Sequence, residues 1–160
     1  MPGSILVAGN ASIDDVTNRV GSRRQPGGAA VYAAVAARIF NDEVKIATAI
    51  GGDYEYKGLL KGIFPSSSIF EVKANSTRFE IEYDGGWNAN YKAVSFGAAR
   101  LLRADQVVKS ARGCSHVHLA PMSPSKVATI VKKLRREQPD TVISVNTWEG
   151  YMHSRGSREL

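Results

Sequence analysis

The chain has 160 residues, of which 43% are hydrophobic and 22% charged, a composition that supports one domain with a core and excludes a disordered chain. Its single cysteine excludes an internal disulfide and a multi-cysteine zinc site, and so predicts a reducing, cytoplasmic setting. The formal net charge is +6, but the basic residues are scattered along predicted helix faces, which disfavours a nucleic-acid partner. No apolar run approaches the roughly 18 residues of a membrane span, so no membrane partner is expected.

Short apolar runs alternate with helix-forming segments along most of the chain. Such runs are typical of buried strands, and their alternation with helices predicts right-handed βαβ units around a parallel sheet, an α/β fold. In chain order, the predicted strands are 4–9, 44–51, 68–73, 114–120 and 141–146. The predicted helices are 29–40, 53–64 and 123–139, with loop and a short helix at 101–113 and an irregular tail at 151–160.

Two polar stretches do not fit inside a parallel sheet. In the segment 76–86, apolar residues such as Phe79 and Tyr83 alternate with charged ones, which is the pattern of a half-exposed strand. That strand ends in an Asp-Gly turn, and the residues after the turn are a candidate partner strand. We therefore predict a small second sheet with strands at about 16–20 and 76–95.

The first candidate site lies where the first predicted strand ends. Asp14 and Asp15 follow that strand, and ligands in open α/β sheets bind beyond the carboxyl ends of strands. A carboxylate there can accept two hydrogen bonds from vicinal hydroxyls, so Asp14 is a candidate for recognising a sugar diol; the alternatives are a helix N-cap or a solvated loop. Gly27 and Gly28 precede the alanine-rich helix, where glycine lets the backbone approach a ligand and helix-start N–H groups attract polar groups.

A second glycine pair repeats this arrangement before the next helix. Gly51 and Gly52 are followed by Asp53, a residue type that often caps helices through its side chain. We interpret this second pair as a strand-to-helix turn with Asp53 as the N-cap, and not as a second ligand site.

Motifs of other catalytic classes are absent from the sequence. It contains no G-x-x-x-x-G-K-[ST] phosphate loop, no G-x-G-x-x-G dinucleotide fingerprint and no G-x-S-x-G nucleophile elbow. His116 and His118 would face the same side of a strand and could form a metal pair. No third ligand follows at a suitable spacing, so we predict no metal site.

Taken in order and spacing, these pieces resemble the N-terminal half of the ribokinase family of carbohydrate and nucleoside kinases, also called the phosphofructokinase-B family. The matching segments are ILVAGNASIDDV, PGGAAVYAAVAARIF, VKIATAIGGDYEYKG, STRFEIEY and HVHLAPMSP followed by VISVN. The resemblance covers about residues 4–150, and we assign 1–150 to the N-terminal part of a ribokinase-like domain.

The resemblance implies a three-layer αβα domain with a small β lid. Full-length relatives use ATP and magnesium to phosphorylate a hydroxymethyl group of a sugar, nucleoside or related alcohol. Asp14 would bind substrate hydroxyls, and Gly27 and Gly28 would lie along the substrate. The lid would close over the site and exclude water, and in many members the lids also pair to make dimers.

Two departures from the family pattern affect the expected site. The family usually has an asparagine four residues after its second glycine, where this chain has Tyr32, so an amide is replaced by an aromatic wall of the substrate site. The family's G-A-G-D signature, which supplies the general base and the phosphoryl-binding glycines, lies beyond the end of this chain. Asn146 and Glu149 do not take the magnesium role of the family's later N-x-x-E motif. We therefore expect no catalytic residue in this chain.

Two interpretations of function follow. The chain is a truncated kinase homologue that binds a sugar or nucleoside without transferring phosphate, or it is a non-catalytic binding or regulatory module. A truncated sheet would expose an apolar edge. We therefore expect a homo-oligomer, formed through the lid or the exposed sheet edge, or association with the missing half.

Overall fold

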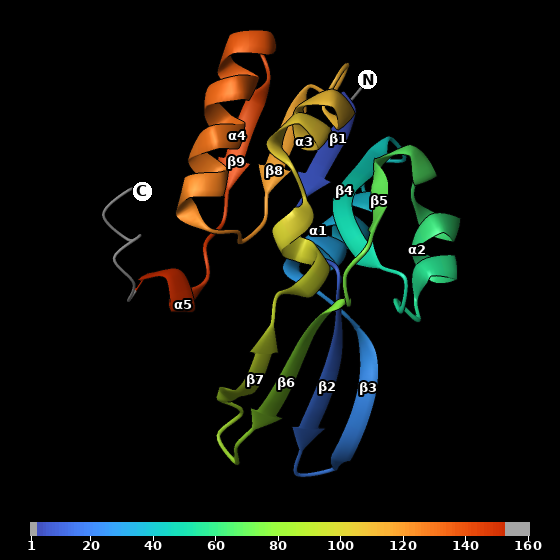
Figure 1. Cartoon of the computed structure of the whole chain (residues 1–160), viewed down its shortest axis with the longest axis vertical. Helices are drawn as coiled ribbons and strands as arrows, with labels where there is room; N and C mark the ends of the chain where they lie inside the picture. The colour runs from blue at the N-terminus through green and yellow to red at the C-terminus, as the bar shows by residue number, and fades with distance from the viewer. Residues whose placement is uncertain (1–2, 153–160) are drawn as a thin grey trace.

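The main body of the molecule is built on a five-stranded parallel sheet. The computed structural model describes residues 3–152, so the predicted tail at 151–160 lies almost wholly outside the described residues. The strand order is β5-β4-β1-β8-β9, and every neighbouring pair is parallel (Figure 1). The strands are β1 (Ile5–Ala8), β4 (Val44–Gly51), β5 (Ile69–Val72), β8 (His116–Leu119) and β9 (Val142–Val145).

Helices cover the two faces of this sheet, which gives three layers. Alternate residues of β1 show the division, because Leu6 packs with the cluster on one face and Val7 with the cluster on the other. The expected α/β class is therefore confirmed. The face of Val7 carries α1 (Ala29–Arg38) and α2 (Lys57–Ile63), and the face of Leu6 carries α3 (Ala104–Ser110) and α4 (Pro124–Glu137); shorter helices are η1 (Ser66–Ser68), η2 (Gly97–Leu101) and α5 (Glu149–Met152).

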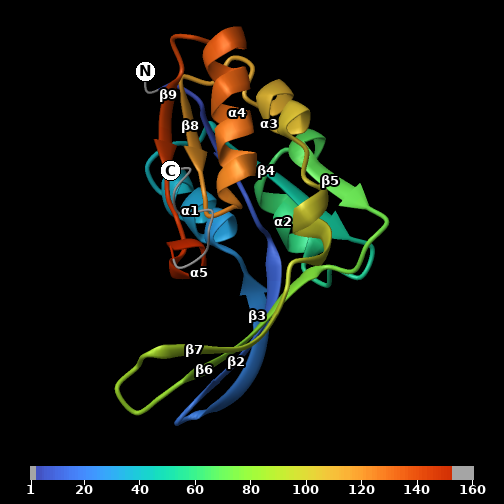
Figure 2. The same cartoon turned by 60° about the vertical axis from the view of Figure 1, so that its left-hand side comes forward.

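A second sheet of four strands, here called the small sheet, extends away from the main body (Figure 2). Its order is β3-β2-β6-β7, with β2 parallel to β6 and antiparallel pairing on either side. Its strands are β2 (Ser12–Asn18), β3 (Gly21–Gly27), β6 (Thr77–Tyr83) and β7 (Ala89–Ser95). For residues 16–28 the sequence allowed a short exposed strand or a hairpin, and the structure has a hairpin whose turn is at Arg19 and Val20. Its first strand begins earlier than the expected 16–20, because Asp14 and Asp15 also pair as strand residues.

One edge of the main sheet is left open among the described residues. The helix α1 packs over β1 and β4, so the same face of β8 and β9 lies beyond it. Val142 on that face is 53% exposed, and Val145 at the end of β9 is 47% exposed. Strands of a parallel sheet are ordinarily covered on both faces, which makes this edge a candidate contact surface.

The described residues contain no helix that is both long enough and apolar enough to cross a lipid bilayer.

Candidate functional site

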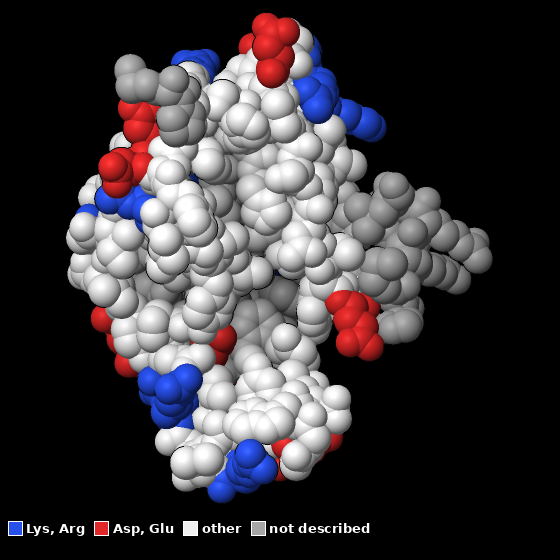
Figure 3. Space-filling model, turned by 180° about the vertical axis from the view of Figure 1, so that it is seen from behind, with Lys and Arg blue, Asp and Glu red and all other residues white. Residues whose placement is uncertain are grey.

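A cavity of about 470 Å³ lies between the main body and the small sheet. Asn10 follows β1, Pro121 follows β8 and Trp148 follows β9, so the cavity lies at the carboxyl ends of three adjacent parallel strands. That is the position at which open α/β sheets bind ligands. The space-filling view in Figure 3 shows the surface hollowed where the two sheets meet, and on this face the lysine and arginine side chains are scattered and form no single patch.

Asp14 presents a buried carboxylate to this cavity. Its side chain extends from β2, and the residue is only 6% exposed. Ser12 Oγ donates a hydrogen bond of 2.6 Å to Asp14 Oδ1, while Oδ2 accepts none from residues 3–152. Burial raises the pKa of Asp14, and the hydrogen bond from Ser12 opposes that rise only in part. The carboxylate therefore has an unused acceptor in a desolvated place, and a ligand with hydroxyl donors would satisfy it.

The first glycine pair makes room for this carboxylate. A Cβ on Gly27 would lie 1.9 Å from Asp14 Oδ2, so only glycine leaves that oxygen its position. Gly28 has φ of 101°, a conformation that L side chains rarely adopt, and its Cβ would lie 2.2 Å from the carbonyl oxygen of Asn10. Gly28 lines the cavity, whereas Gly27 is not among the lining residues. The observed role of Gly27 is to accommodate Asp14.

Tyr32 lines the cavity from the first turns of α1. Its hydroxyl donates to the carbonyl oxygen of Pro26 at 3.1 Å and lies 3.2 Å from Nε2 of Gln25, which donates to it. Burial raises the pKa of the Tyr32 phenol, and the nearby charge of Asp14 adds to the rise. The structure thus brings Asp14, Gly28 and Tyr32 to one cavity, with Gly27 directly behind the carboxylate.

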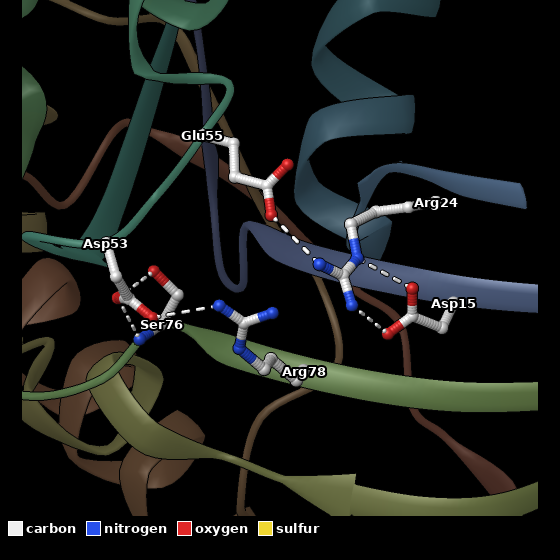
Figure 4. Close-up of polar contacts among 6 residues, drawn as sticks. All are labelled: Asp15, Arg24, Asp53, Glu55, Ser76 and Arg78. Atoms are coloured by element: carbon white, nitrogen blue, oxygen red, sulfur yellow. Dashed lines mark hydrogen bonds and ion pairs between the residues drawn. The ribbon is translucent and has the colours of Figure 1, made fainter.

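The second glycine pair lies at the expected turn where β4 ends, but Asp53 is not the helix N-cap that we expected. The helix α2 begins only at Lys57, and its N-cap is Tyr56. The Asp53 carboxylate instead accepts hydrogen bonds from Ser76 N at 2.7 Å, Ser76 Oγ at 2.8 Å and the guanidinium of Arg78 at 3.0 Å (Figure 4). This aspartate therefore ties the main body to the start of β6 in the small sheet.

A second ionic link joins the two sheets beside the first. Arg24 on β3 donates to both carboxylate oxygens of Asp15 on β2, at 2.7 and 2.8 Å, and reaches Glu55 in the main body at 3.4 Å (Figure 4). Asp15 is absent from the cavity lining and its side chain is 44% exposed. Two neighbouring aspartates thus serve different purposes, one facing the cavity and one joining strands on the outside.

Sequence reasoning missed most of the aromatic side chains that line the cavity. Apart from Tyr32, the sequence indicated two of them, because Phe79 and Tyr83 alternate with charged residues in β6 and share a face with Ile81. The others come from the β6–β7 turn, from β7, from the residue after β7, and from the segment of α5. We call the following set the aromatic wall: Phe79, Tyr83, Trp87, Tyr91, Phe96, Trp148 and Tyr151.

The two histidines considered as a metal pair lie on one face of β8, where their neighbours are hydroxyl groups. Nδ1 of His116 shares a hydrogen bond of 2.9 Å with Ser115 Oγ, and Nδ1 of His118 shares one of 2.8 Å with Ser144 Oγ. Burial lowers the pKa of His118, which favours its neutral form. Within residues 3–152, no three side chains of the metal-ligating types gather closely enough to hold an ion.

Known protein structures share this architecture, although no family model and no curated protein matches the sequence. A ribokinase from Giardia lamblia superposes with a TM-score of 0.78 at 17% identity, over 98% of this chain and 55% of that chain. A fructokinase with bound ATP from Xylella fastidiosa gives 0.77 at 18% identity, over 99% and 54%. A nucleoside kinase from Burkholderia thailandensis in complex with inosine gives 0.74 at 16% identity, over 92% and 53%.

These comparisons define the class of the fold. The chain has the ribokinase-like α/β fold found in carbohydrate and nucleoside kinases, as the sequence motifs predicted. It spans about half the length of each of these three structures.

Proposed function

We propose that the cavity binds an alcohol with vicinal hydroxyls, a sugar or a nucleoside, in the manner of a kinase substrate site. The observation that carries this proposal is the buried Asp14 carboxylate, which lines the cavity and whose Oδ2 accepts no hydrogen bond from the described residues. A diol supplies two O–H donors to a carboxylate, and a buried anion gains most from donors of this kind. In this proposal the small sheet acts as a lid over the bound alcohol.

The proposed activity of the whole protein is ATP-dependent phosphorylation of that alcohol. Asp14 is the one carboxylate among the described residues that line the cavity. It accepts a hydrogen bond from Ser12, and in this proposal its other oxygen binds the substrate hydroxyls. We therefore propose that this chain supplies the alcohol site and that ATP and magnesium are held by residues outside it. The same observation favours a second candidate, a non-catalytic sugar- or nucleoside-binding module. Phosphate transfer from ATP to a sugar or nucleoside by the purified chain would exclude that candidate, and it would also contradict the placement of ATP outside this chain.

Replacing Asp14 with asparagine is expected to weaken binding while stabilising the free protein. Because the amide lacks the negative charge of the carboxylate acceptor, we expect affinity for a bound sugar or nucleoside to fall by about tenfold or more. The folded-state pKa of Asp14 is raised above its ordinary value of 3.8, so ionisation costs the native state stability as pH rises through that folded value. The melting temperature of Asp14→Asn should therefore exceed that of the wild type at neutral pH, and the difference should vanish below about pH 4.

The matched control is Asp15→Asn, the neighbouring aspartate on the outer face. It loses one exposed ion pair with Arg24, so binding should stay within a few-fold of the wild type and stability should change by less than about 1 kcal/mol. A thermal-shift screen of sugars and nucleosides, followed by calorimetric titration, measures both effects. Equal ligand affinity in Asp14→Asn and the wild type would show that Asp14 is not the diol site.

We also propose that the chain forms an oligomer through the open edge of the main sheet. The strand β9 at this edge carries Val142 and Val145, which are exposed on opposite faces of the sheet. A lysine side chain at this edge should block association, so Val142→Lys is expected to convert the oligomer to monomer in sedimentation experiments. Val20→Lys, at the hairpin turn of the small sheet, is the control, and a monomer from that variant alone would place the contact on the small sheet instead.

A further inference from the structure

The seven rings of the aromatic wall form two groups that line the cavity: a connected cluster of five rings, and the pair Tyr83 and Trp87, whose centroids lie 6.4 Å apart. Trp148 lies at the centre of the cluster, because its ring is in edge contact with the rings of Tyr91 at 5.4 Å, Tyr151 at 5.5 Å and Phe96 at 6.3 Å between centroids. Phe79 contacts Tyr91 at 6.0 Å and so extends the cluster onto β6. Edge contacts of this kind hold rings in fixed orientations. Phe79, Tyr91, Phe96, Trp148 and Tyr151 therefore form one packed cluster of rings.

The polarity of the cavity changes along the strands of the small sheet. Asp14 on β2 pairs in register with Phe79 on β6, nearest the main body. Further out, Val16 pairs with Ile81, and Tyr83 follows at the end of β6. Among the described residues that line the cavity, the charged side chains are confined to Asp14 and Arg23. Arg23 pairs with Val16 at this outer end, where Asn18 also lines the cavity, so aromatic rings there are accompanied by polar side chains. A ligand that fills this space has hydroxyls at the Asp14 end and, beyond them, a flat group with polar edge atoms.

From this arrangement we infer that the ligand is a nucleoside-like alcohol, in which Asp14 receives the ribose diol and a planar heteroaromatic ring stacks on the aromatic wall. The inference rests on the proposed function, because it names the ligand class of the same site. Stacking on an aromatic side chain contributes about 1–3 kcal/mol for each base, whereas a free sugar leaves most of the wall in contact with water. The cavity volume of about 470 Å³ falls within the range of about 300–1,000 Å³ that is usual for small-molecule sites.

The backbone conformation of Trp87 supports the inference independently of the polarity of the cavity. It lies in the β6–β7 turn with φ of 63°, the left-handed region that bulky residues seldom occupy. Its backbone N–H donates to the carbonyl oxygen of Asp84, and the guanidinium of Arg19 lies 5.0 Å from the centroid of its indole ring. Glycine would suit this backbone better, so the indole is retained at a conformational cost. Strain of this kind is concentrated at ligand sites, and here it holds a large flat ring against the cavity.

Calorimetric titration of the purified chain with ribose and with inosine tests the inference. We expect inosine to bind at least about fivefold more tightly than ribose, the lower limit set by stacking of one base. Trp87→Gly should remove most of that advantage and leave ribose affinity unchanged, while the melting temperature stays the same or rises because the turn loses its strain. Trp87→Phe keeps a flat ring and should retain part of the advantage. Fluorescence supplies a second readout, because both tryptophans of the chain line the cavity.

The outcomes of these titrations separate the inference from the proposed function. Equal affinities for ribose and inosine that both depend on Asp14 would overturn the inference and leave the proposed function intact. Dideoxyinosine that binds as tightly as inosine would overturn the diol role of Asp14 and leave the stacking intact. Binding of neither ribose nor inosine would overturn both. An inosine preference that survives unchanged in Trp87→Gly would overturn the role of Trp87 and with it the inference.

Discussion

Replacing Gly27 with alanine is expected to abolish ligand binding and to cost about 1–3 kcal/mol of stability. The added methyl carbon would lie 1.9 Å from Oδ2 and 2.4 Å from Oδ1 of Asp14, which is too close for non-bonded heavy atoms. The carboxylate would have to rotate away, and it would then lose the hydrogen bond from Ser12 and its place in the cavity. Calorimetric titration with inosine and chemical denaturation of the same preparation measure the two losses.

The second glycine pair provides the control for this substitution. A Cβ on Gly52 would meet no other atom within 4 Å, so Gly52→Ala should bind ligand like the wild type and change stability by no more than about 0.5 kcal/mol. The two substitutions are chemically identical and differ only in what the methyl contacts. Wild-type affinity in Gly27→Ala would contradict the placement of Asp14 at the ligand site.

Replacing Asp53 with alanine is expected to lower stability by about 1–3 kcal/mol and to weaken the contact between the main body and the small sheet. The reason is that the buried residue Ser76 would lose the acceptor of its N–H and hydroxyl groups. Burial raises the pKa of Asp53, but hydrogen bonds from Ser76 and Arg78 outweigh burial and lower the pKa to about 2. Since the folded pKa is depressed, the stabilisation is complete above about pH 4 and is lost as pH falls toward 2. Urea unfolding of both proteins across this range measures the effect.

The control for Asp53→Ala is Glu55→Ala, which removes the other link from the main body to the small sheet. Glu55 is 42% exposed and lies 3.4 Å from Arg24, so its loss should change stability by less than about 1 kcal/mol. A stability difference between Asp53→Ala and the wild type that stays constant from pH 6 to pH 2 would speak against the carboxylate as the source of the effect.

The main sheet and its helices were predictable because they depend on local patterns. Apolar runs alternate with helix-forming segments, and each of these patterns repeats within a few residues, so the sequence shows them directly. The strand β6 was predictable for the same reason, since apolar and charged residues alternate from Phe79 to Tyr83. The early start of β2 at Ser12 was not, because Asp14 and Asp15 disfavour a strand when judged alone. Their strand conformation depends on pairing with β3 and β6, which no local pattern reports.

The candidate site also combines residues that the sequence indicated with contacts that only the folded chain shows. The sequence alone selected Asp14 and Gly28, because they follow a strand or open a helix, and such positions converge at one edge of a parallel sheet. Tyr32 was selected only through the family resemblance, since it stands where the family usually has an asparagine. The sequence also selected Asp53, but its partner Ser76 lies 23 residues away, and only the folded chain shows that the pair joins two sheets. A carboxylate accepts hydrogen bonds from backbone N–H groups whether it caps a helix or binds a distant strand, so only the tertiary structure decides between these two roles.

The aromatic wall shows most clearly what local pattern cannot report. Phe79 and Trp148 are far apart in the chain, yet both line one cavity because β6 belongs to the small sheet and Trp148 follows an edge strand of the main sheet. Residue types and their spacing were sufficient to predict the α/β class and to select Asp14 and Gly28, which the structure places at the cavity. The flat, aromatic side of that site exists only through the relative placement of the two sheets, since packing between distant segments depends on the whole fold.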